Sequence, residues 1–259
     1  MDKKIFVFLL FLITVFTVNA QNDTLSLKKN KITFGVNAGV NASFFNTPVS
    51  ELGNEASLGY SSFFRLGANF GVRVFYHLND YIKLESGFGY SGKGEEYRKR
   101  NPNVVIIGNG KSENAYYKTR FRLDYFEIPL IANVNLKKLF KEANFNYKPV
   151  YFKTGFSTAF NVNSDIRTNY YTPTSGSSGP IVDVEEDFNS IPFDYAKPFI
   201  LNFIAGVEFV NNHTNEGDFV IGLLFNQTLQ SVYNKDIVSN YNYNTTNTTF
   251  TFKIGFLFK

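Results

Sequence analysis

The feature that most constrains this chain is a strict alternation of apolar and polar residues through Phe63–Tyr90. Every even position from Phe64 to Tyr76 is apolar, and most of the residues between them are Gly, Asn or Arg. The pattern breaks at residues 77–80 and then resumes. A period of two predicts two antiparallel strands joined by a tight turn. Both exceed the usual five or six residues of a soluble strand, and roughly nine to eleven residues suffice to cross a bilayer.

The N-terminus has the layout of a secretory signal peptide. Lys3 and Lys4 precede an apolar run of 14 residues, Ile5 to Val18, and Val18-Asn19-Ala20 is an acceptable cleavage site. The run is short of the roughly 20 residues that a membrane-spanning helix needs. We therefore expect residues 1–20 to be removed and residues 21–259 to form one exported domain, with no Cys available for a lipid anchor or a disulfide.

Alternation recurs along the exported part and predicts eight strands. The outward, apolar set of the first strand begins at Ile32 and ends at Phe44, and that of the last strand runs from Phe250 to Phe258. The predicted strands are Ile32–Phe44, the two strands within Phe63–Tyr90, Thr119–Asn135, Val150–Val162, and the segments 199–209, 219–225 and 250–258. We predict an all-β fold, an eight-stranded antiparallel up-and-down transmembrane β-barrel.

The connections between these strands alternate in length, which agrees with such a barrel. Long segments are expected outside the cell and short turns in the periplasm. The long ones are 46–61, 92–118, 163–197 and 231–247; the connection 136–148 is longer than a periplasmic turn usually is and includes a helix-like piece, 137–143. Within 92–118, the run Val104–Ile107 is apolar enough to extend a strand beyond the membrane. The fourth strand changes apolar face near Tyr125-Phe126, which predicts a β-bulge there.

Short sequence motifs resemble one family. The segment Ile32–Phe44 looks like the opening strand of PorT-type outer-membrane β-barrel proteins of Bacteroidetes, and Leu123–Pro129 (LDYFEIP) resembles their strand Y-L-E-I-P-L. The same family is resembled by residues 87–92, by the Phe-rich last strand and by Asn19-Ala20-Gln21 at the end of the predicted signal peptide. The resemblance implies a small outer-membrane barrel, and some members are linked to protein secretion across that membrane. It carries over no functional residue.

Motifs that would carry catalysis or cofactor binding have structural explanations here. Gly87–Gly92 spells G-x-G-x-x-G, but its glycines lie in a strand and no helical period follows, so a dinucleotide site is not expected. The two histidines, His77 and His213, fall in predicted turns without metal-ligand spacing. The acidic residues Asp183, Glu185, Glu186 and Asp187 lack the spacing of a calcium loop. We predict no catalytic, cofactor-binding or metal-binding residue and no cofactor.

Charged residues at inward positions form the most informative set. They are Arg65, Arg73, Lys83, Glu85, Arg122 or Asp124, Lys153, Glu208 and Lys253. One interpretation is an ion path. The other is a filled interior with paired charges, which we favour because eight strands enclose a space that side chains fill and an unpaired buried charge is costly.

The sequence thus predicts a non-enzymatic protein of the outer membrane. Its expected contacts are the membrane lipid and protein partners that bind the loops 92–118, 163–197 and 231–247, in an accessory role in secretion, transport or surface attachment. Net charge is only +4 without a basic aromatic cluster, so no nucleic acid is expected. Two alternatives remain: a small pore or transporter, and a soluble periplasmic lipid-binding barrel with its faces inverted.

Overall fold

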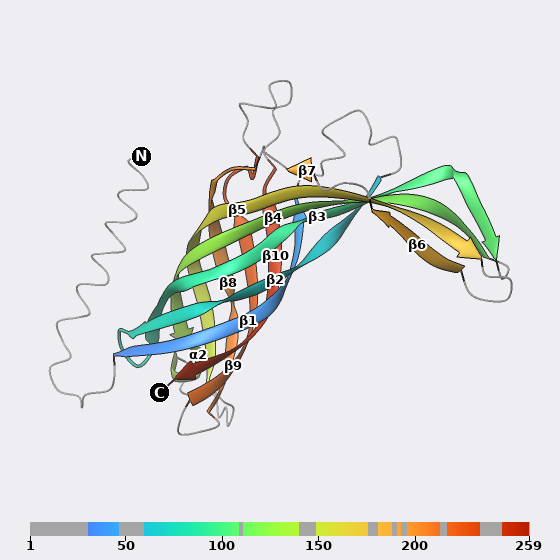
Figure 1. The fold of residues 1–259 in the computed structure, drawn as a ribbon. Coiled ribbons are helices and arrows are strands. Elements are labelled where there is room, and N and C mark those ends of the chain that lie inside the picture. Colours follow the sequence, from blue (N-terminus) through green and yellow to red (C-terminus); the bar gives the residue numbers. More distant parts are fainter. Residues whose placement is uncertain are drawn as a thin grey trace.

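The protein is a closed, tilted β-barrel from which a sheet projects at one end (Figure 1). The computed structural model describes residues 31–46, 60–108, 111–139, 149–175, 181–187, 191–192, 196–212, 217–233 and 245–258. The strands are β1 (Ile32–Phe45), β2 (Tyr60–His77), β3 (Ile82–Gly108), β4 (Lys111–Asn135), β5 (Val150–Ser175), β6 (Ile181–Asp187), β7 (Ile191–Pro192), β8 (Phe199–Asn212), β9 (Gly217–Thr228) and β10 (Asn247–Phe258).

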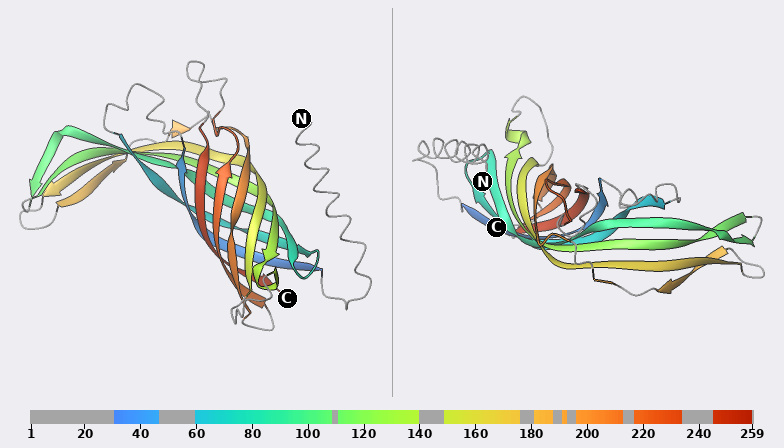
Figure 2. Two further views of the ribbon diagram at one scale, coloured as in Figure 1. Left: turned by 180° about the vertical axis from the view of Figure 1, so that it is seen from behind. Right: turned by 90° about the horizontal axis from the view of Figure 1, so that it is seen from above.

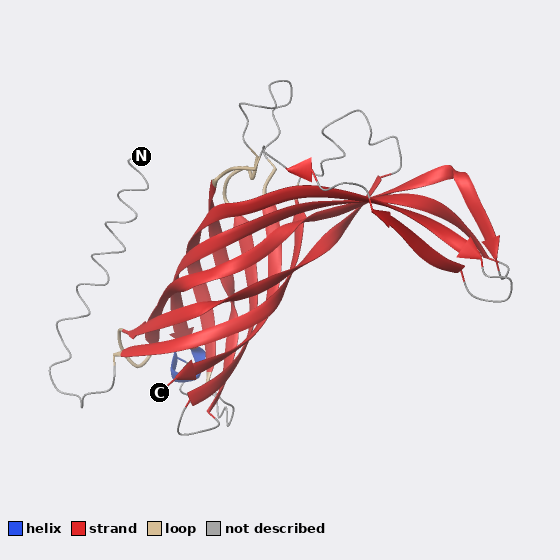
Figure 3. Ribbon diagram, in the orientation of Figure 1, coloured by secondary structure: helices blue, strands red, loops and turns tan. Residues whose placement is uncertain are grey.

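Eight of these strands form the ring. Each pairs antiparallel with its neighbours in the order β4, β3, β2, β1, β10, β9, β8, β5, and a further β4–β5 pairing closes the sheet. The first and last strands meet along Gly35–Phe45 and Asn247–Leu257. Figure 3 shows that strands make up nearly all of the described chain. The prediction of an eight-stranded up-and-down barrel is confirmed.

The outer wall of the barrel is apolar and the interior is polar. Phe34, Phe70, Phe126, Leu130 and Leu223 are each between 50% and 64% exposed on the outside. The residues that alternate with the outward ones along each strand point inward. Among these inward residues, Asn41, Lys153, Asn202 and Glu208 are almost completely buried. A soluble barrel would hide its apolar face, so the inverted, lipid-carrying alternative is wrong. An exposed apolar wall around a closed ring requires lipid as its solvent.

The two ends of the barrel differ. The start of β1, the end of β10 and the short β2–β3 turn at Leu78–Tyr81 lie at one end. The strand ends that the long connections join lie at the other end, which is the extracellular end in membrane barrels. A short helix, α2 (Leu136–Leu139), follows β4 within the expected 136–148 connection. Among the described residues, no helix is long and apolar enough to cross a membrane.

Three strands continue far beyond the apolar wall. β3, β4 and β5 have 27, 25 and 26 residues, and β6 pairs with the far part of β5. Together they form a sheet that projects from the extracellular end, which we call the arm (Figures 1 and 2). The expectation that 92–118 and 163–197 are loops is wrong for their described residues, most of which lie in paired strands of β3, β4, β5 and β6. The strand extension expected at Val104–Ile107 is confirmed.

The bulge expected in β4 lies in its partner strand. Odd residues of β4 face inward from Phe121 to Asn135, so β4 keeps one phase throughout. The register shifts because Asp124 lies opposite Asn163 and Tyr125 opposite Asn161, which leaves Val162 of β5 as the extra residue. The apparent change of face in the sequence arises because Leu123 and Tyr125 are apolar residues buried inside the barrel.

One glycine offers a direct test of this backbone. Gly94 has φ +141°, and an added Cβ would overlap the carbonyl O of Phe121 on β4. We expect Gly94→Val to lower the free energy of unfolding by about 1–3 kcal/mol, the usual cost of a residue held in a disfavoured conformation. The measurement is the urea midpoint at which the fast-migrating, unboiled band on a gel is lost.

Gly92→Ala is the matched control. The Cβ added there meets only atoms at 3.5 Å or more, which is ordinary van der Waals contact. Its midpoint should stay close to that of the unsubstituted protein. Equal midpoints for the two variants would contradict the close β3–β4 approach at Gly94.

Candidate functional site

The barrel interior holds an ion network built from five strands. Arg73 on β2 donates to Glu85 on β3 at 2.8 Å and to Glu208 on β8 at 2.7 Å. Lys153 on β5 contacts both carboxylates, at 3.1 Å in the case of Glu208, and Lys253 on β10 lies 3.6 Å from Glu208. These five residues are 0–5% exposed. Five of the predicted inward charges therefore meet in one place, as the filled-interior interpretation expects.

This network links the barrel wall across its diameter. Neighbouring strands are already joined by backbone hydrogen bonds, but Arg73 and Glu208 belong to strands that are not neighbours in the ring. Charge-assisted hydrogen bonds of this kind are short and strong when water is excluded. The guanidinium of Arg73 also lies 4.6 Å from the ring centre of Phe75, which covers it from the periplasmic side.

Hydrogen-bonded polar side chains fill the next layer. Asn41 on β1 donates to Ser91 on β3 at 3.0 Å and accepts from Thr251 on β10 at 2.7 Å. On the opposite side, Asn202 donates to Ser157 at 3.1 Å and accepts from Thr228 at 3.0 Å. Each of these two asparagines thus both donates and accepts within the barrel, as buried polar side chains require.

Apolar clusters close both ends of the interior. At the periplasmic end, the buried residues are Phe75, Tyr151, Val210, Val220 and Leu257. At the extracellular end, they are Phe45, Tyr97, Phe121, Leu123, Tyr125, Ala159, Ile200, Val232 and Tyr233. The ring centres of the extracellular aromatic pairs are 5.5–6.3 Å apart, packed edge to face. An ion crossing the barrel would have to pass both clusters and the network between them.

Two inward acids and one lysine were missed by sequence reasoning. Lys93 on β3 pairs with Glu127 on β4 at 2.6 Å, and Glu95 is fully buried beneath the extracellular cluster, where it accepts from Ser62, Tyr97 and the backbone N–H of Phe45. Lys93 and Glu95 fall in the segment expected to be a loop. Every second residue of a strand faces the same side, so extending the inward set from Glu85 along the strand would have placed Lys93 and Glu95 inside the barrel.

The remaining predicted inward charges lie elsewhere. Lys83 lies at the periplasmic end with its Nζ 4.4 Å from the ring centre of Tyr151. Arg65 donates to the carbonyl O of Lys93 near the other end. Arg122 and Asp124 share the face of β4 that carries Phe126, so the prediction that one of them points inward is wrong; they pair with each other at 2.7 Å.

Arg122 and Asp124 belong to a charged group that we call the arm-base cluster. Its members are Glu96, Arg98, Lys118, Arg120, Arg122, Asp124, Asp165 and Arg167. Glu96 accepts from Arg98 and Lys118 at 3.0 Å and from Arg120 at 3.3 Å. Burial opposes ionisation of Glu96, but hydrogen bonds and charge from Lys118 and Arg98 outweigh it and hold the pKa of Glu96 below its usual value.

The motifs set aside in the sequence have structural roles where they are described. Gly87 and Gly89 lie in β3 against the backbone of β2, as expected for small inward residues. His77 is the last residue of β2 rather than part of a turn, and its Nε2 lies 2.9 Å from Oγ1 of Thr33. His213 and the side chains of β6, including the acidic Asp183–Asp187, lie outside the described part. Within that part, no group of three or more His, Cys, Asp or Glu residues is placed to hold a metal.

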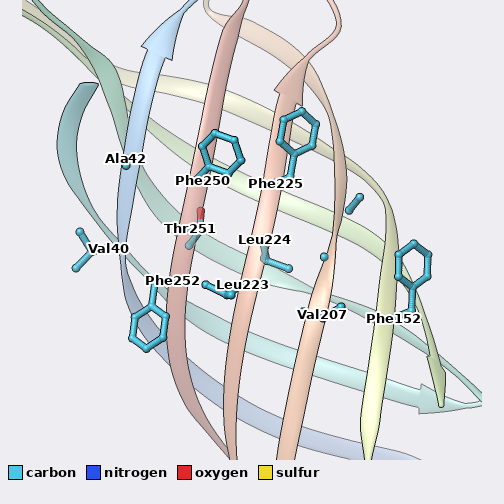
Figure 4. Close-up of a pocket in the computed structure, with 12 residues that line it drawn as sticks. Val40, Ala42, Phe152, Val207, Leu223, Leu224, Phe225, Phe250, Thr251 and Phe252 are labelled. Atoms are coloured by element: carbon cyan, nitrogen blue, oxygen red, sulfur yellow. The ribbon is translucent and has the colours of Figure 1, made fainter. Parts of the chain in front are cut away.

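The outer wall carries a shallow groove. It has a volume of about 570 Å³ and crosses β1, β10, β9, β8 and β5 (Figure 4). Phe152, Phe225, Phe250 and Phe252 form its ridges, and small residues such as Ala205 leave the space between them. Because these side chains belong to the exposed apolar wall, the groove faces lipid rather than the barrel interior.

The interior network generates a stability prediction. Glu208→Gln removes the carboxylate shared by Arg73, Lys153 and Lys253 and leaves Glu85 to balance all three cations. We expect the free energy of unfolding to fall by about 3–5 kcal/mol, the usual cost of breaking a buried ion pair. The measurement is the urea midpoint in detergent micelles.

Arg167→Gln serves as the control. Its guanidinium is 50% exposed and pairs with Asp165, so its loss should cost at most about 1 kcal/mol. Adding Lys253→Met to Glu208→Gln should restore part of the stability, since it removes one uncompensated cation. A midpoint for Glu208→Gln equal to that of Arg167→Gln would show that the network contributes little to stability.

The comparisons with known proteins agree with this architecture. Residues 19–259 match the family model described as "Outer membrane protein beta-barrel domain". No curated protein matches the chain.

Solved structures similar to the chain include three bacterial proteins, each 9–13% identical to it. The attachment invasion locus protein Ail of Yersinia pestis is 10% identical, with 88% of this chain and 99% of that chain covered and a TM-score of 0.35. Neisserial surface protein A is 13% identical, with 87% and 96% covered and a TM-score of 0.34. OprG of Pseudomonas aeruginosa is 9% identical, with 88% and 94% covered and a TM-score of 0.28.

The family model spans nearly the whole chain, and the closed ring, apolar wall and filled polar interior are the features that a barrel of this kind requires. This chain belongs to the outer membrane protein β-barrel domain family, and the bilayer that its wall faces is the outer membrane.

Proposed function

We propose that this protein is a non-conducting, non-enzymatic scaffold that holds a rigid sheet at the cell surface for a protein partner. The observation that carries this proposal is the continuity of β3, β4 and β5, which are neighbouring strands of the barrel wall and extend beyond it into the arm as single strands. Because the interior is filled, we assign contact with other macromolecules to the arm.

The arm is built for rigidity. Strand hydrogen bonds join β3 to β4 as far as Gly108–Lys111 and join β4 to β5 as far as Tyr116–Tyr171. Cross-strand aromatic pairs add to this: the rings of Tyr116 and Tyr171 stack at 4.9 Å, and those of Tyr117 and Tyr170 lie 4.7 Å apart. Such pairs contribute beyond backbone bonding and keep the sheet in one register.

The accessory role expected from the PorT-type resemblance fits this architecture. A protein that assists secretion or attachment needs a fixed surface outside the membrane rather than a catalytic centre. A signal peptide at residues 1–20 would deliver the chain to the outer membrane, and the partner would bind the segments 92–118 and 163–197 in their arm form. Tyr233, near the start of the segment 231–247, forms a β-bridge with Ala196.

The pore alternative leads to a conductance experiment. In planar bilayers, we expect the purified barrel to show no steady ionic conductance, because two apolar clusters and the ion network fill the interior. A porin of known conductance, refolded in the same way, is the control. Stable single-channel steps from the unsubstituted protein would overturn the scaffold proposal in favour of a pore.

The partner proposal leads to an experiment on intact cells. A photo-crosslinking amino acid at Tyr117, which is 38% exposed on the arm, should form a defined covalent adduct with one surface or secreted protein. The same group at Phe252 on the lipid-facing wall is the matched control and should give no protein adduct. The level of that partner outside the cell should fall when residues 100–116 and 169–189 are each replaced by a short turn. An unchanged level, with the shortened protein still folded, would count against the arm as the functional surface.

A further inference from the structure

We infer that the arm-base cluster binds phosphate groups of the anionic lipid in the outer leaflet. This inference goes beyond the scaffold proposal and does not depend on a protein partner. It follows from where the cluster lies, from how its charges are arranged and from the chemistry available at that depth.

The cluster begins where the lipid-facing wall ends. Along β4, the outward residues run Leu130, Ile128 and Phe126, all 48–64% exposed, and two residues further on the same face reaches Asp124 and then Arg122. On β5, the extra residue Val162 shifts the phase, so that Asp165 and Arg167 lie opposite Arg122 and Arg120 on this same face. At about 3.3 Å per residue, the first arginine lies roughly 13 Å along the strand from Phe126, at the level of the lipid headgroups.

Within the cluster, the anions are buried beneath the cations. Glu96, Asp124 and Asp165 are 11%, 2% and 9% exposed. The guanidinium side chains above them are considerably more exposed: Arg98 at 40%, Arg120 at 36%, Arg122 at 34% and Arg167 at 50%. A guanidinium has five N–H donors, and a carboxylate below it uses only some of them. Since these four arginine side chains are 34–50% exposed, part of each guanidinium can be reached by a ligand from outside.

Among the described side chains of the cluster, the charges do not balance. Five cations (Arg98, Lys118, Arg120, Arg122 and Arg167) stand against three carboxylates, an excess of two positive charges, and Arg65 lies close enough to interact with Asp124 and Asp165 as well. Basic groups at the membrane surface attract anionic headgroups, and the planar guanidinium matches the geometry of phosphate. A lipid phosphate supplies the missing negative charge at this depth.

The aromatic residues beside the cluster support an interfacial position. Arg98 lies 4.5 Å from the ring centre of Phe63 and 5.6 Å from that of Tyr116, and Lys118 lies 5.7 Å from that of Tyr171. Tyr116 and Tyr171 continue the same face of the sheet beyond the cluster. Membrane barrels carry girdles of aromatic residues at both interfaces. There, an aromatic side chain can place its apolar part in lipid and its polar group in water.

The test uses a charge-removing double variant, Arg120→Gln with Arg167→Gln. It cancels the excess of two positive charges, yet Glu96 keeps Arg98 and Lys118, and Asp165 keeps Arg122 at 3.8 Å. The buried carboxylates therefore retain partners. The matched control is Lys31→Gln with Lys137→Gln, which removes two exposed charges at the periplasmic end. Heat-modifiability on a gel confirms that each protein is folded.

The measurement is native mass spectrometry of the protein in detergent micelles titrated with bisphosphorylated lipid A or with the same lipid after both phosphates are removed. We expect the unsubstituted protein and the control to bind the phosphorylated lipid and the double variant to bind it at least about tenfold more weakly, since it lacks two guanidiniums that would donate hydrogen bonds to phosphate. The lipid without phosphates should bind all three proteins equally weakly.

Other results would overturn the inference. Equal affinity of the double variant and the control for the phosphorylated lipid would exclude the cluster as the site. Equal binding of the lipid with and without phosphates would exclude phosphate recognition. If inorganic phosphate alone raises the urea midpoint of the unsubstituted protein as much as the lipid does, the cluster takes free phosphate and the assignment to a lipid is wrong.

Discussion

The constraint on which this structure depends is that lipid offers no hydrogen-bond partner to a peptide group. Every backbone N–H and C=O within the bilayer must therefore be paired by the chain itself, and strands can do so only by closing into a ring. Here β1 pairs with β10 and β4 with β5, so that no strand edge is left open within the membrane. The apolar wall is the part of this closed ring that contacts lipid. The polar interior is where its side chains pack against one another, and the arm is the part that extends into water.

Closure of an eight-stranded ring determines how the interior must be filled. The enclosed space is narrow, and its lining cannot be lipid-facing, so alternate residues of every strand must pack against one another. The inward residues of β3 show how this is arranged along one strand: Glu85 joins the ion network, Ser91 the polar layer, and Tyr97 the extracellular cluster. Charges in the middle and aromatic residues at the ends give the interior a filled, layered structure in which buried ions keep their partners.

The barrel could be predicted from the sequence because a strand between lipid and a polar interior must alternate in hydrophobicity. The arm could not, because a sheet with water on both sides loses that alternation; charged stretches such as Glu96–Arg100 then resemble a loop. Only the apolar run Val104–Ile107 indicated a strand there. The same reasoning failed at Leu123 and Tyr125, whose apolar side chains fill the interior and imitate an outward face.

Two of the irregularities in strand pairing lie at the level where the strands leave the apolar wall, and a third, between Arg100 and Val105 in the β3–β4 pairing, lies within the arm. The β2–β3 register shifts between Phe64 and Asn69, and the β4–β5 register shifts at Val162. A bulge re-aims side chains while the strands on either side stay paired. At Val162 it turns Asp165 and Arg167 toward the face that carries Arg122, so two carboxylates and two guanidiniums meet there. The transition from membrane to arm is thus a change of side-chain chemistry on strands that remain continuous. The direction of the arm is set by the ring, which favours a protein that acts by holding a surface in place rather than by moving it.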